Sequence, residues 1–224
     1  CELYDPSLVF TAQLQDGANV SYGQIAFTLE GSARSILATE RLILNCMQHM
    51  SGIATQTAYY VGLIAGTNCT LLDTRKTTPG IRALEKWAVV IGGGENHRFA
   101  LYDMVMLKDN HIDFAGGLHQ AIDKTTSYLK QHDLDLKIIV EARDLHEVSE
   151  ILKHHNIHRI LLDNFSLEDT RKAVEMVGNQ TKTESSGGIN EENMRAYAEC
   201  GVNYISSGAL THSIYNLDLS LKAI

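Results

Sequence analysis

Short, mostly apolar runs alternate with longer amphipathic segments along most of the chain. This alternation is typical of parallel strands joined by crossover helices. We therefore expect six strands, which lie within residues 68–74, 104–110, 137–143, 159–164, 181–186 and 202–208. Six strands without a clear internal repeat suit either a doubly wound sheet or a barrel.

The segments between these runs predict helices. In one of them, Leu145, Val148, Ile151 and Leu152 recur at helical spacing and form a single apolar stripe. The expected helices cover residues 80–91, 118–132, 145–154, 167–177 and 191–199. An earlier helix is expected to begin at Thr39, a residue type favoured at the N-cap, with Gly52 as a candidate interruption.

Residues 1–37 predict strands and turns instead. Ile25, Phe27 and Leu29 alternate with polar positions, and Asp16-Gly17 is a hairpin signal. So few strands do not make a core, so this part is expected to pack on another segment or on a partner chain. Because the chain opens at residue 1 without a methionine, we also expect an earlier piece of this small domain to be missing.

Polar residues follow each of the six runs, and they decide between the two folds. A β/α barrel brings the carboxyl ends of all its strands to one rim, whereas a doubly wound sheet brings together only those near its switch point. We therefore predict an α/β protein with a β/α barrel after a small mixed α/β domain. The expected boundaries are 1–37 for the small domain, 38–212 for the barrel and 213–224 for a segment that returns to the small domain.

Charge is distributed unevenly. The whole chain is −8, from 19 Lys and Arg against 27 Asp and Glu. Residues 71–111 hold six Lys or Arg against five Asp or Glu, and are therefore about +1. A local cationic patch on an acidic protein favours a small anionic ligand over nucleic acid, which needs a broad basic face.

Two bulk features bear on location. No apolar run approaches the length that crosses a membrane. The four cysteines are scattered without CxxC spacing, which favours a reducing, cytoplasmic compartment over a disulfide framework; they are Cys1, Cys46, Cys69 and Cys200.

Three cationic side chains are candidates for binding a dicarboxylate. Arg75, His97 and Arg98 lie in the basic segment, and a guanidinium fork matches the geometry of a carboxylate. The alternative is that they form surface ion pairs with acids of the same segment, namely Asp73, Glu85 and Glu95.

Glu141 and Asp163 end apolar strands, where an unpaired carboxylate would be costly. Mg²⁺ held by one or two carboxylates and by ligand phosphates fits this pattern. A salt bridge to Lys76 or Lys108 is the alternative.

Two glycine-containing loops follow the last two strands, at residues 185–188 and 206–209. Backbone amides and hydroxyls in such loops bind phosphate, and late loops of a barrel are frequent phosphate sites. Tight turns from strand to helix are the alternative for each loop alone. Their candidate ligand-binding residues are Ser186, Gly187, Gly188, Ser207 and Gly208.

Several motifs occur together in one order. They are ERLILN at 40–45, SGIAT at 51–55, DTRKTTPG at 73–80, GGGENHR at 92–98, KDNH at 108–111, LLDN at 161–164, ESSGGIN at 184–190 and SSGALTHS at 206–213. With these motifs the sequence resembles the quinolinate phosphoribosyltransferases, also called nicotinate-nucleotide pyrophosphorylases. The resemblance covers most of the chain after residue 40.

The resemblance implies a pentosyltransferase of NAD biosynthesis. It would join quinolinate to phosphoribosyl pyrophosphate with Mg²⁺, and release pyrophosphate, CO₂ and nicotinate mononucleotide. The family fold that it implies is an α/β barrel after a mixed N-terminal domain, assembled as a dimer or a larger homo-oligomer.

The resemblance also implies roles for single residues. The quinolinate carboxylates would be held by Arg75, His97 and Arg98, with Arg41 reaching in from a neighbouring subunit. Lys76 and Lys108 would flank the reacting centre. Glu141 and Asp163 would lie by the ribose hydroxyls and Mg²⁺, and Ser186, Gly187, Gly188, Ser207 and Gly208 would bind the 5′-phosphate.

One position departs from the family pattern. Two residues before Glu141, where the family often has a second acid, this chain has Ile139, and both positions face the same side of the strand. Three other readings remain open: a phosphoribosyltransferase for another pyridine acid, a non-catalytic phosphate-binding or assembly protein, and a Schiff-base aldolase that uses Lys108.

Overall fold

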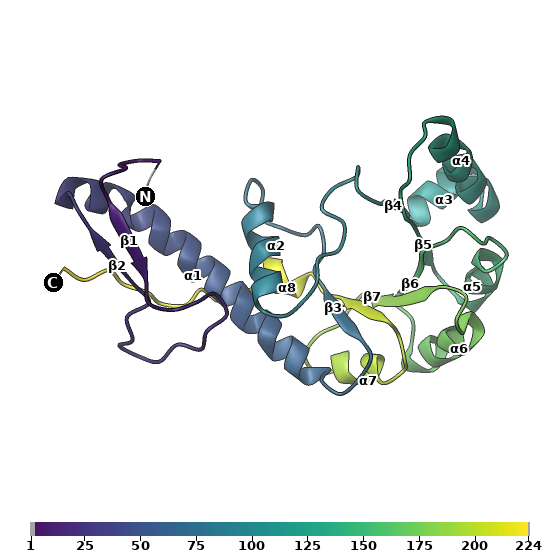
Figure 1. The fold of residues 1–224 in the computed structure, drawn as a ribbon. Coiled ribbons are helices and arrows are strands. Elements are labelled where there is room, and N and C mark those ends of the chain that lie inside the picture. The colour runs from purple at the N-terminus through teal and green to yellow at the C-terminus, as the bar shows by residue number, and fades with distance from the viewer. Residues whose placement is uncertain (1–2, 224) are drawn as a thin grey trace.

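The computed structural model describes residues 3–223, and its main feature is a parallel sheet of six strands. The strands are β3 (Thr70–Leu72), β4 (Val105–Leu107), β5 (Ile138–Ala142), β6 (Arg159–Asp163), β7 (Lys182–Ser186) and β8 (Tyr204–Ser206). Their order is β3-β8-β7-β6-β5-β4, so the last strand pairs with the first and the others follow in sequence. This is the order of a β/α barrel that is open between β3 and β4, and the sheet curves accordingly (Figure 1). The six expected strands and the predicted fold class are confirmed.

The two faces of this sheet differ in chemistry, because successive residues of a strand point to opposite sides. One face, here called the outer face, carries buried aliphatic residues such as Leu107, Val140 and Ile160, which belong to the main core shared with the helices. The other, the inner face, carries Ile139, Glu141 and their register partners. Apolar packing is thus concentrated outside the sheet, and ionisable groups are free to gather inside.

Helices surround the outer face. They are α2 (Arg82–Ile91), α3 (Asp109–Ala115), α4 (Leu118–Gln131), α5 (Leu145–Ile151), α6 (Leu167–Val177), α7 (Met194–Ala198) and α8 (Ala209–His212). The five helices expected between the strands are confirmed. Helices α3 and α8 are additional, and α3 begins at Asp109, inside the segment that was expected to be strand.

The longest helix, α1 (Ala33–Leu63), differs from the expectation at two points. The prediction of Thr39 as its N-cap is wrong, since the helix begins six residues earlier and the Thr39 hydroxyl donates to the carbonyl of Ser35 at 3.0 Å. Gly52 does not interrupt it either. A side chain at Gly52 would collide with the backbone carbonyl of Tyr215, so this glycine permits a close approach of the C-terminal segment.

An antiparallel pair, β1 (Val9–Ala12) and β2 (Phe27–Glu30), lies beside the first part of α1, away from the main sheet (Figure 1). The expected strand pair is confirmed, but the expected hairpin turn is not, because residues 13–26 connect the two strands. Asp16 and Gly17 form a local turn inside that connection, where the Ala18 amide donates to Gln15.

The C-terminal segment runs back along α1 toward this pair (Figure 1). The Leu217 amide donates to the Gln48 carbonyl at 3.2 Å, and the Gln48 side chain donates to the Leu219 carbonyl at 2.9 Å. The domain boundaries at residues 37 and 212 stay a prediction.

Among residues 3–223, no helix is both long and apolar enough to span a membrane. Cys46, Cys69 and Cys200 are free thiols in this part of the chain, and Cys1 lies outside the described residues.

Candidate functional site

The carboxyl ends of β4, β5 and β6 bring Lys108, Glu141 and Asp163 together. The Lys108 Nζ lies 3.6 Å from the Glu141 Oε2. Burial raises the pKa of the Glu141 carboxyl; Lys108 opposes that rise and the negative charge of Asp163 adds to it. The salt-bridge alternative therefore holds geometrically for Glu141, but Lys108 does not cancel the effect of burial on this carboxyl.

These two carboxylates are the groups here that suit a metal ion. Within residues 3–223 there is no cluster of three or more His, Cys, Asp or Glu side chains arranged to hold one. A pair of carboxylates on neighbouring strands fits an ion that takes its other ligands from water and from phosphate oxygens. Mg²⁺ is such an ion, because it keeps several waters and is commonly held by one or two carboxylates.

The first glycine loop follows β7 and lies against the end of β6. Ser186 is the register partner of Asp163, and the Asn164 amide donates to the Ser186 carbonyl at 2.9 Å. Gly187 and Gly188 have φ angles of 92° and 61°, a region that favours glycine. A side chain at Gly187 would collide with Asn164. This loop therefore keeps its backbone accessible next to the carboxylate pair.

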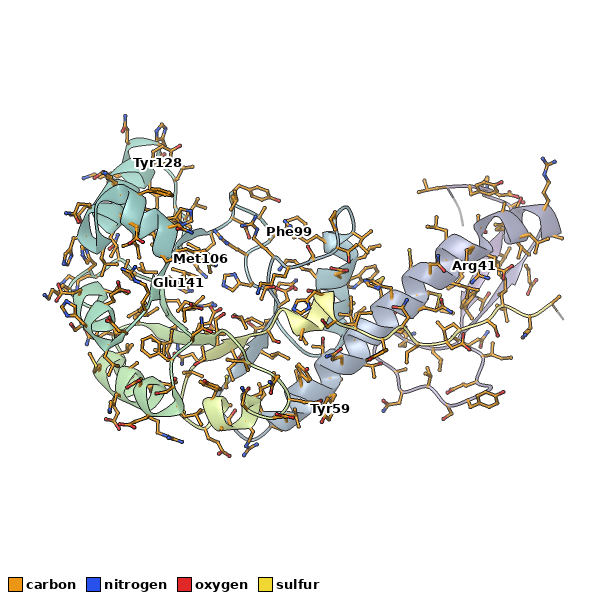
Figure 2. All side chains as sticks on the ribbon, turned by 180° about the vertical axis from the view of Figure 1, so that it is seen from behind. Arg41, Tyr59, Phe99, Met106, Tyr128 and Glu141 are labelled. Carbon is orange, nitrogen blue, oxygen red and sulfur yellow. The ribbon has the colours of Figure 1, made fainter. Side chains whose placement is uncertain are left out.

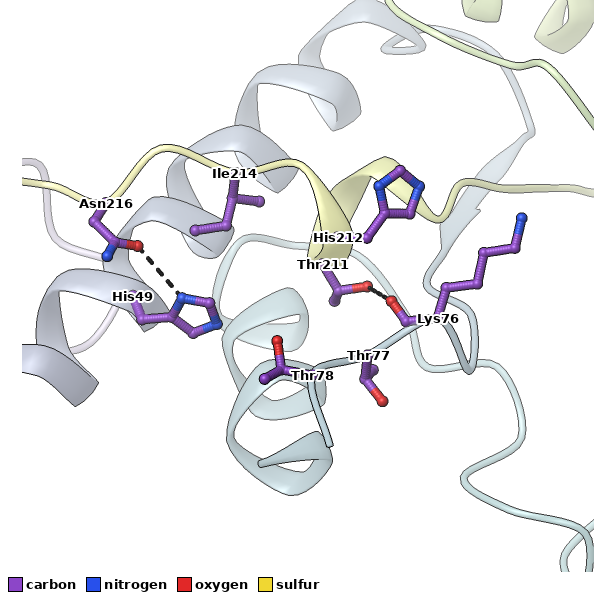
Figure 3. A pocket seen from close by; sticks show the side chains of 8 residues that line it. All are labelled: His49, Lys76, Thr77, Thr78, Thr211, His212, Ile214 and Asn216. Atoms are coloured by element: carbon purple, nitrogen blue, oxygen red, sulfur yellow. Dashed lines mark hydrogen bonds between the residues drawn. The ribbon is translucent and has the colours of Figure 1, made fainter. Parts of the chain in front are cut away.

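The second loop brings Gly208 against Lys76. A Cβ atom at Gly208 would lie 3.0 Å from the Lys76 Cδ and 3.0 Å from the His212 Cδ2. The Thr211 hydroxyl donates to the Lys76 carbonyl at 2.8 Å (Figure 3). The segments after β3 and β8 are thus in direct contact, and Lys76 lies where they meet.

A cavity of about 390 Å³ lies beside this junction (Figure 3). Its lining residues are His49, Lys76, Thr77, Thr78, Thr211, His212, Ile214 and Asn216. Sequence reasoning missed His212. A usable signal was its place four residues after Gly208, since positions one helical turn apart lie on the same side of a helix.

The cationic side of the site contains Arg75 and Arg98. Burial lowers the pKa of the Arg98 guanidinium, and the positive charge of Arg75 lowers it further. Arg98 is buried and donates to the Met104 carbonyl at 3.2 Å. Two guanidinium groups that repel each other in this way are an arrangement suited to an anion.

The alternative ion pairs for these cations are contradicted at two of the three acids. Asp73 contacts Lys86 at 2.5 Å, and Glu85 contacts His49 at 2.8 Å. Both acids are fully buried. Sequence reasoning missed these pairs because Glu85 and Lys86 lie in an amphipathic helix, where charged residues normally face solvent.

His97 lies inside the sheet near the arginines, and its backbone is held on both sides. Its amide donates to Asp73 at 2.8 Å, and its carbonyl accepts from Lys86 at 3.0 Å. Its ring is directed toward Glu184, another inner-face residue that sequence reasoning did not assign to the site.

Arg41 and Ile139 lie apart from the residues described above. Arg41 is exposed on α1, and Figure 2 shows it far from Glu141, so one chain does not bring it to the other site residues. Ile139 is fully buried and packs with Met106 and Leu161 in a small inner-face cluster. The position at which this chain has Ile instead of an acid is therefore part of an apolar layer beneath Glu141.

Two family models match the chain. Residues 1–51 match "Quinolinate phosphoribosyl transferase, N-terminal domain", and residues 53–222 match "Quinolinate phosphoribosyl transferase, C-terminal domain". Together they cover nearly all of the chain.

Curated relatives and solved structures agree with these matches. The chain is 43% identical over 232 aligned positions to "Quinolinate phosphoribosyltransferase [decarboxylating] 1b" of Nicotiana tabacum, covering 97% of this chain and 66% of the relative. It is 44% identical to "Nicotinate-nucleotide pyrophosphorylase [carboxylating], chloroplastic" of Arabidopsis thaliana, covering 99% and 67%. The crystal structure of NadC from Streptococcus pyogenes superposes with a TM-score of 0.92 at 38% identity, covering 99% of this chain and 77% of that one. The chain thus spans about two thirds of the length of its plant relatives.

Proposed function

The chain belongs to the quinolinate phosphoribosyltransferase family, and from this we propose that it transfers the phosphoribosyl group of phosphoribosyl pyrophosphate to quinolinate. The products are nicotinate mononucleotide, pyrophosphate and CO₂, and the protein acts in NAD biosynthesis. One observation supports the proposal most: Arg75, Lys76, Lys108, Glu141, Asp163 and the two glycine loops follow the ends of the six parallel strands, and Arg98 joins them from the segment between α2 and β4.

Quinolinate is assigned to the cationic side. Arg75 and Arg98 hold its two carboxylates, and His97 supports the backbone of Arg98 from the same side of the site. The repulsion between the Arg75 and Arg98 guanidinium groups supports this role, because a doubly negative ligand between them would offset it. A ring acid with one carboxylate would leave one cation unpaired.

Phosphoribosyl pyrophosphate is assigned to the other side. Ser186, Gly187, Gly188, Ser207 and Gly208 receive the 5′-phosphate, and Glu141 and Asp163 lie by the ribose hydroxyls. The positive φ angles of Gly187 and Gly188 support backbone binding of phosphate. When bound at Glu141 and Asp163, Mg²⁺ would neutralise charge on the pyrophosphate group.

The chemistry needs placement and electrostatics more than a nucleophile from the protein. As the bond to pyrophosphate breaks, positive charge develops at the anomeric carbon, and the Glu141 and Asp163 carboxylates stabilise it. Lys76 and Lys108 stabilise the leaving group. The new N-glycosidic bond makes the pyridine nitrogen cationic, and this stabilises the electron pair that stays on the ring carbon when its bond to CO₂ breaks. A proton from water then bonds to that carbon.

The activity is tested by incubating the protein, in a preparation shown to be folded, with quinolinate, phosphoribosyl pyrophosphate and Mg²⁺. Release of pyrophosphate and CO₂ in equal amounts is expected. Binding of phosphoribosyl pyrophosphate without turnover would support a non-catalytic relative instead. Faster turnover of nicotinate than of quinolinate, without CO₂, would identify a different pyridine acid as the substrate.

We also propose that the active unit is a homo-oligomer, at least a dimer, in which Arg41 enters the site of a neighbouring chain. The exposure of Arg41 on α1 supports this, as do Leu37 and Leu42, which are 70% and 71% exposed on the same helix. A cytoplasmic location stays a prediction, since the Arabidopsis relative's name assigns that protein to the chloroplast.

A further inference from the structure

The ring of His97 has its two nitrogens in different environments. Its Nδ1 accepts a hydrogen bond from the Arg98 backbone amide at 2.7 Å. An acceptor nitrogen carries no hydrogen, so the proton of a neutral ring lies on Nε2. His97 is 8% exposed, and its backbone is fixed by Asp73 and Lys86, so the ring is held in place by more than its side-chain contacts.

The Nε2 atom is directed toward a buried carboxylate. It lies 3.4 Å from the Glu184 Oε2, and Glu184 is fully buried on β7. The Arg159 Nη1 donates to the same oxygen at 2.6 Å. Burial alone would raise the pKa of the Glu184 carboxyl, but His97 and Arg159 together hold it below its ordinary value. Glu184 therefore stays an anion in the interior.

Arg159 is fixed in turn. It is 6% exposed at the start of β6, and its guanidinium lies 3.9 Å from the centroid of the Tyr204 ring. A cation over an aromatic face is attracted by the ring quadrupole, and stacking fixes the plane of the guanidinium. Arg159, Glu184 and His97 thus form a buried series that ends at the backbone amide of Arg98.

This series disfavours one of the two tautomers of His97. With the proton on Nδ1, the Arg98 amide would face another N–H, and the Glu184 carboxylate would face a nitrogen lone pair. With the proton on Nε2, both contacts are favourable. Among residues 3–223 no other group bonds to Nε2, so its proton faces the Glu184 carboxylate in a long contact of 3.4 Å. That proton is therefore directed to Glu184 and not to a ligand, while the other ring nitrogen holds the Arg98 backbone.

We propose that Glu184 and Arg159 are positioning residues that hold His97 in its Nε2–H tautomer, so that Nδ1 accepts from the Arg98 amide and fixes the backbone that presents the Arg98 guanidinium to a carboxylate of the pyridine substrate. Neither residue touches the substrate. The proposal rests on the proposed function for the identity of the ligand, but the tautomer itself is a property of the protein without substrate. For histidines that bind metals, replacing the group that bonds the other ring nitrogen costs about 10- to 100-fold in affinity or activity, and we expect an effect of that order here.

The first test is ¹⁵N NMR of the substrate-free protein, with the signals of His97 identified among the ten histidines by their absence in His97→Gln. We expect a protonated Nε2 and an unprotonated Nδ1. A protonated Nδ1 in the wild-type protein would overturn the proposal without any variant.

The second test uses Glu184→Gln, which removes the charge and keeps the size. We expect the His97 signals to shift toward a mixture of tautomers, and KM for quinolinate to rise on the order of 10-fold, with KM for phosphoribosyl pyrophosphate changed less than about 2-fold. Glu184→Asp, which keeps the charge, should restore most of the effect. Unchanged His97 signals together with an unchanged KM for quinolinate would refute the role of Glu184.

A matched control is Glu85→Gln. Glu85 is also fully buried and also faces a histidine, His49, but it does not contact His97. It should leave the His97 signals unchanged, whereas a shift of the same size would mean that any lost buried charge produces it.

Glu184→Gln leaves the buried charge of Arg159 without its partner, and this could prevent folding. In that case the double variant Glu184→Gln with Arg159→Gln is used, because removing both charges of a buried pair is often tolerated. The wild-type Nε2–H tautomer retained in the double variant would also overturn the proposal. Absence of pyrophosphate release by the wild-type protein would count against the proposed function and leave the tautomer result standing.

Discussion

Arg75 and Arg98 carry the same charge but differ in burial: Arg98 is buried and Arg75 is exposed. Truncating one partner of a buried charge pair costs about 2–5 kcal/mol, and a hydrogen bond to a charged group contributes about 1.5–3 kcal/mol. We therefore expect Arg98→Ala to weaken quinolinate binding more than Arg75→Ala does. Calorimetry should show little change for phosphoribosyl pyrophosphate in either variant.

Arg171→Ala, at an exposed position on α6, is the control and should bind both ligands normally. Equal losses for quinolinate and phosphoribosyl pyrophosphate in the Arg98 variant would contradict the assignment of this residue to the quinolinate side.

Glu141 leads to a prediction about pH. Its pKa in the folded protein is raised above the ordinary value of 4.5, chiefly by burial. A carboxyl whose pKa is raised on folding destabilises the fold as the pH rises from the unfolded value through the folded one. The free energy of unfolding of Glu141→Gln, minus that of the wild type, should therefore be larger at pH 7 than at pH 4. The variant should also lose activity.

Urea unfolding at both pH values measures this difference. Glu168→Gln, at an exposed position on α6, serves as the control. A Glu141→Gln variant with the same relative stability at both pH values would show that its carboxyl is not destabilised by burial.

Single residues also show what a sequence can indicate about a site. Glu141 and Asp163 were found because each ends an apolar run, where a charge stands out. Glu85 and Lys86 were missed because hydropathy shows that a residue is charged but not whether its side chain points into the protein or into solvent. They are buried, while the adjacent Trp87 is 54% exposed, which is the reverse of the usual order. Only the contacts with His49 and Asp73 explain that reversal.

At the scale of elements, helix α1 offers a pair of glycines for comparison. Alanine in place of a helical glycine usually stabilises by about 0.5–1 kcal/mol. Gly62 has open space around its Cα, so Gly62→Ala should give this gain. Gly52→Ala should instead destabilise the protein, because its methyl group collides with the backbone at Tyr215.

Thermal unfolding of the two variants measures the contrast. Equal stabilisation by both would mean that the C-terminal segment does not lie against α1. Hydrogen exchange at Leu217, whose amide is bonded to Gln48, should be faster in Gly52→Ala and unchanged in Gly62→Ala.

Element types were easier to predict than element ends. The six strands follow from apolar runs, and the apolar stripe of α5 is buried as expected at Val148 and Ile151. The start of α1 was placed six residues late, at Thr39, because a hydroxyl residue inside a helix looks like a cap. Gly52 was taken for an interruption because its neighbour, Tyr215, is distant in sequence.

At the scale of the whole molecule, the position of Arg41 predicts sharing of sites between chains. Arg41→Ala and Arg75→Ala should each be nearly inactive alone. Mixed by unfolding and refolding together, they should regain about a quarter of the wild-type sites if the unit is a dimer, because each hybrid holds one intact site. Activity assays before and after mixing measure the recovery.

The control mixes Arg75→Ala with Arg98→Ala, two changes on the same side of one barrel, which should give no recovery. No recovery in the Arg41 mixture, with hybrids demonstrated by mass spectrometry, would place Arg41 outside the neighbour's site.

The division between the outer and inner faces of the sheet has a consequence for how such a protein can change over evolution. Aliphatic packing is concentrated on the outer face, and the ionisable groups line the inner one. Substitutions at the rim can therefore alter which ring acid is accepted without removing the packing that keeps the barrel folded. Ile139 marks where this freedom ends, since it belongs to the inner face but packs as core.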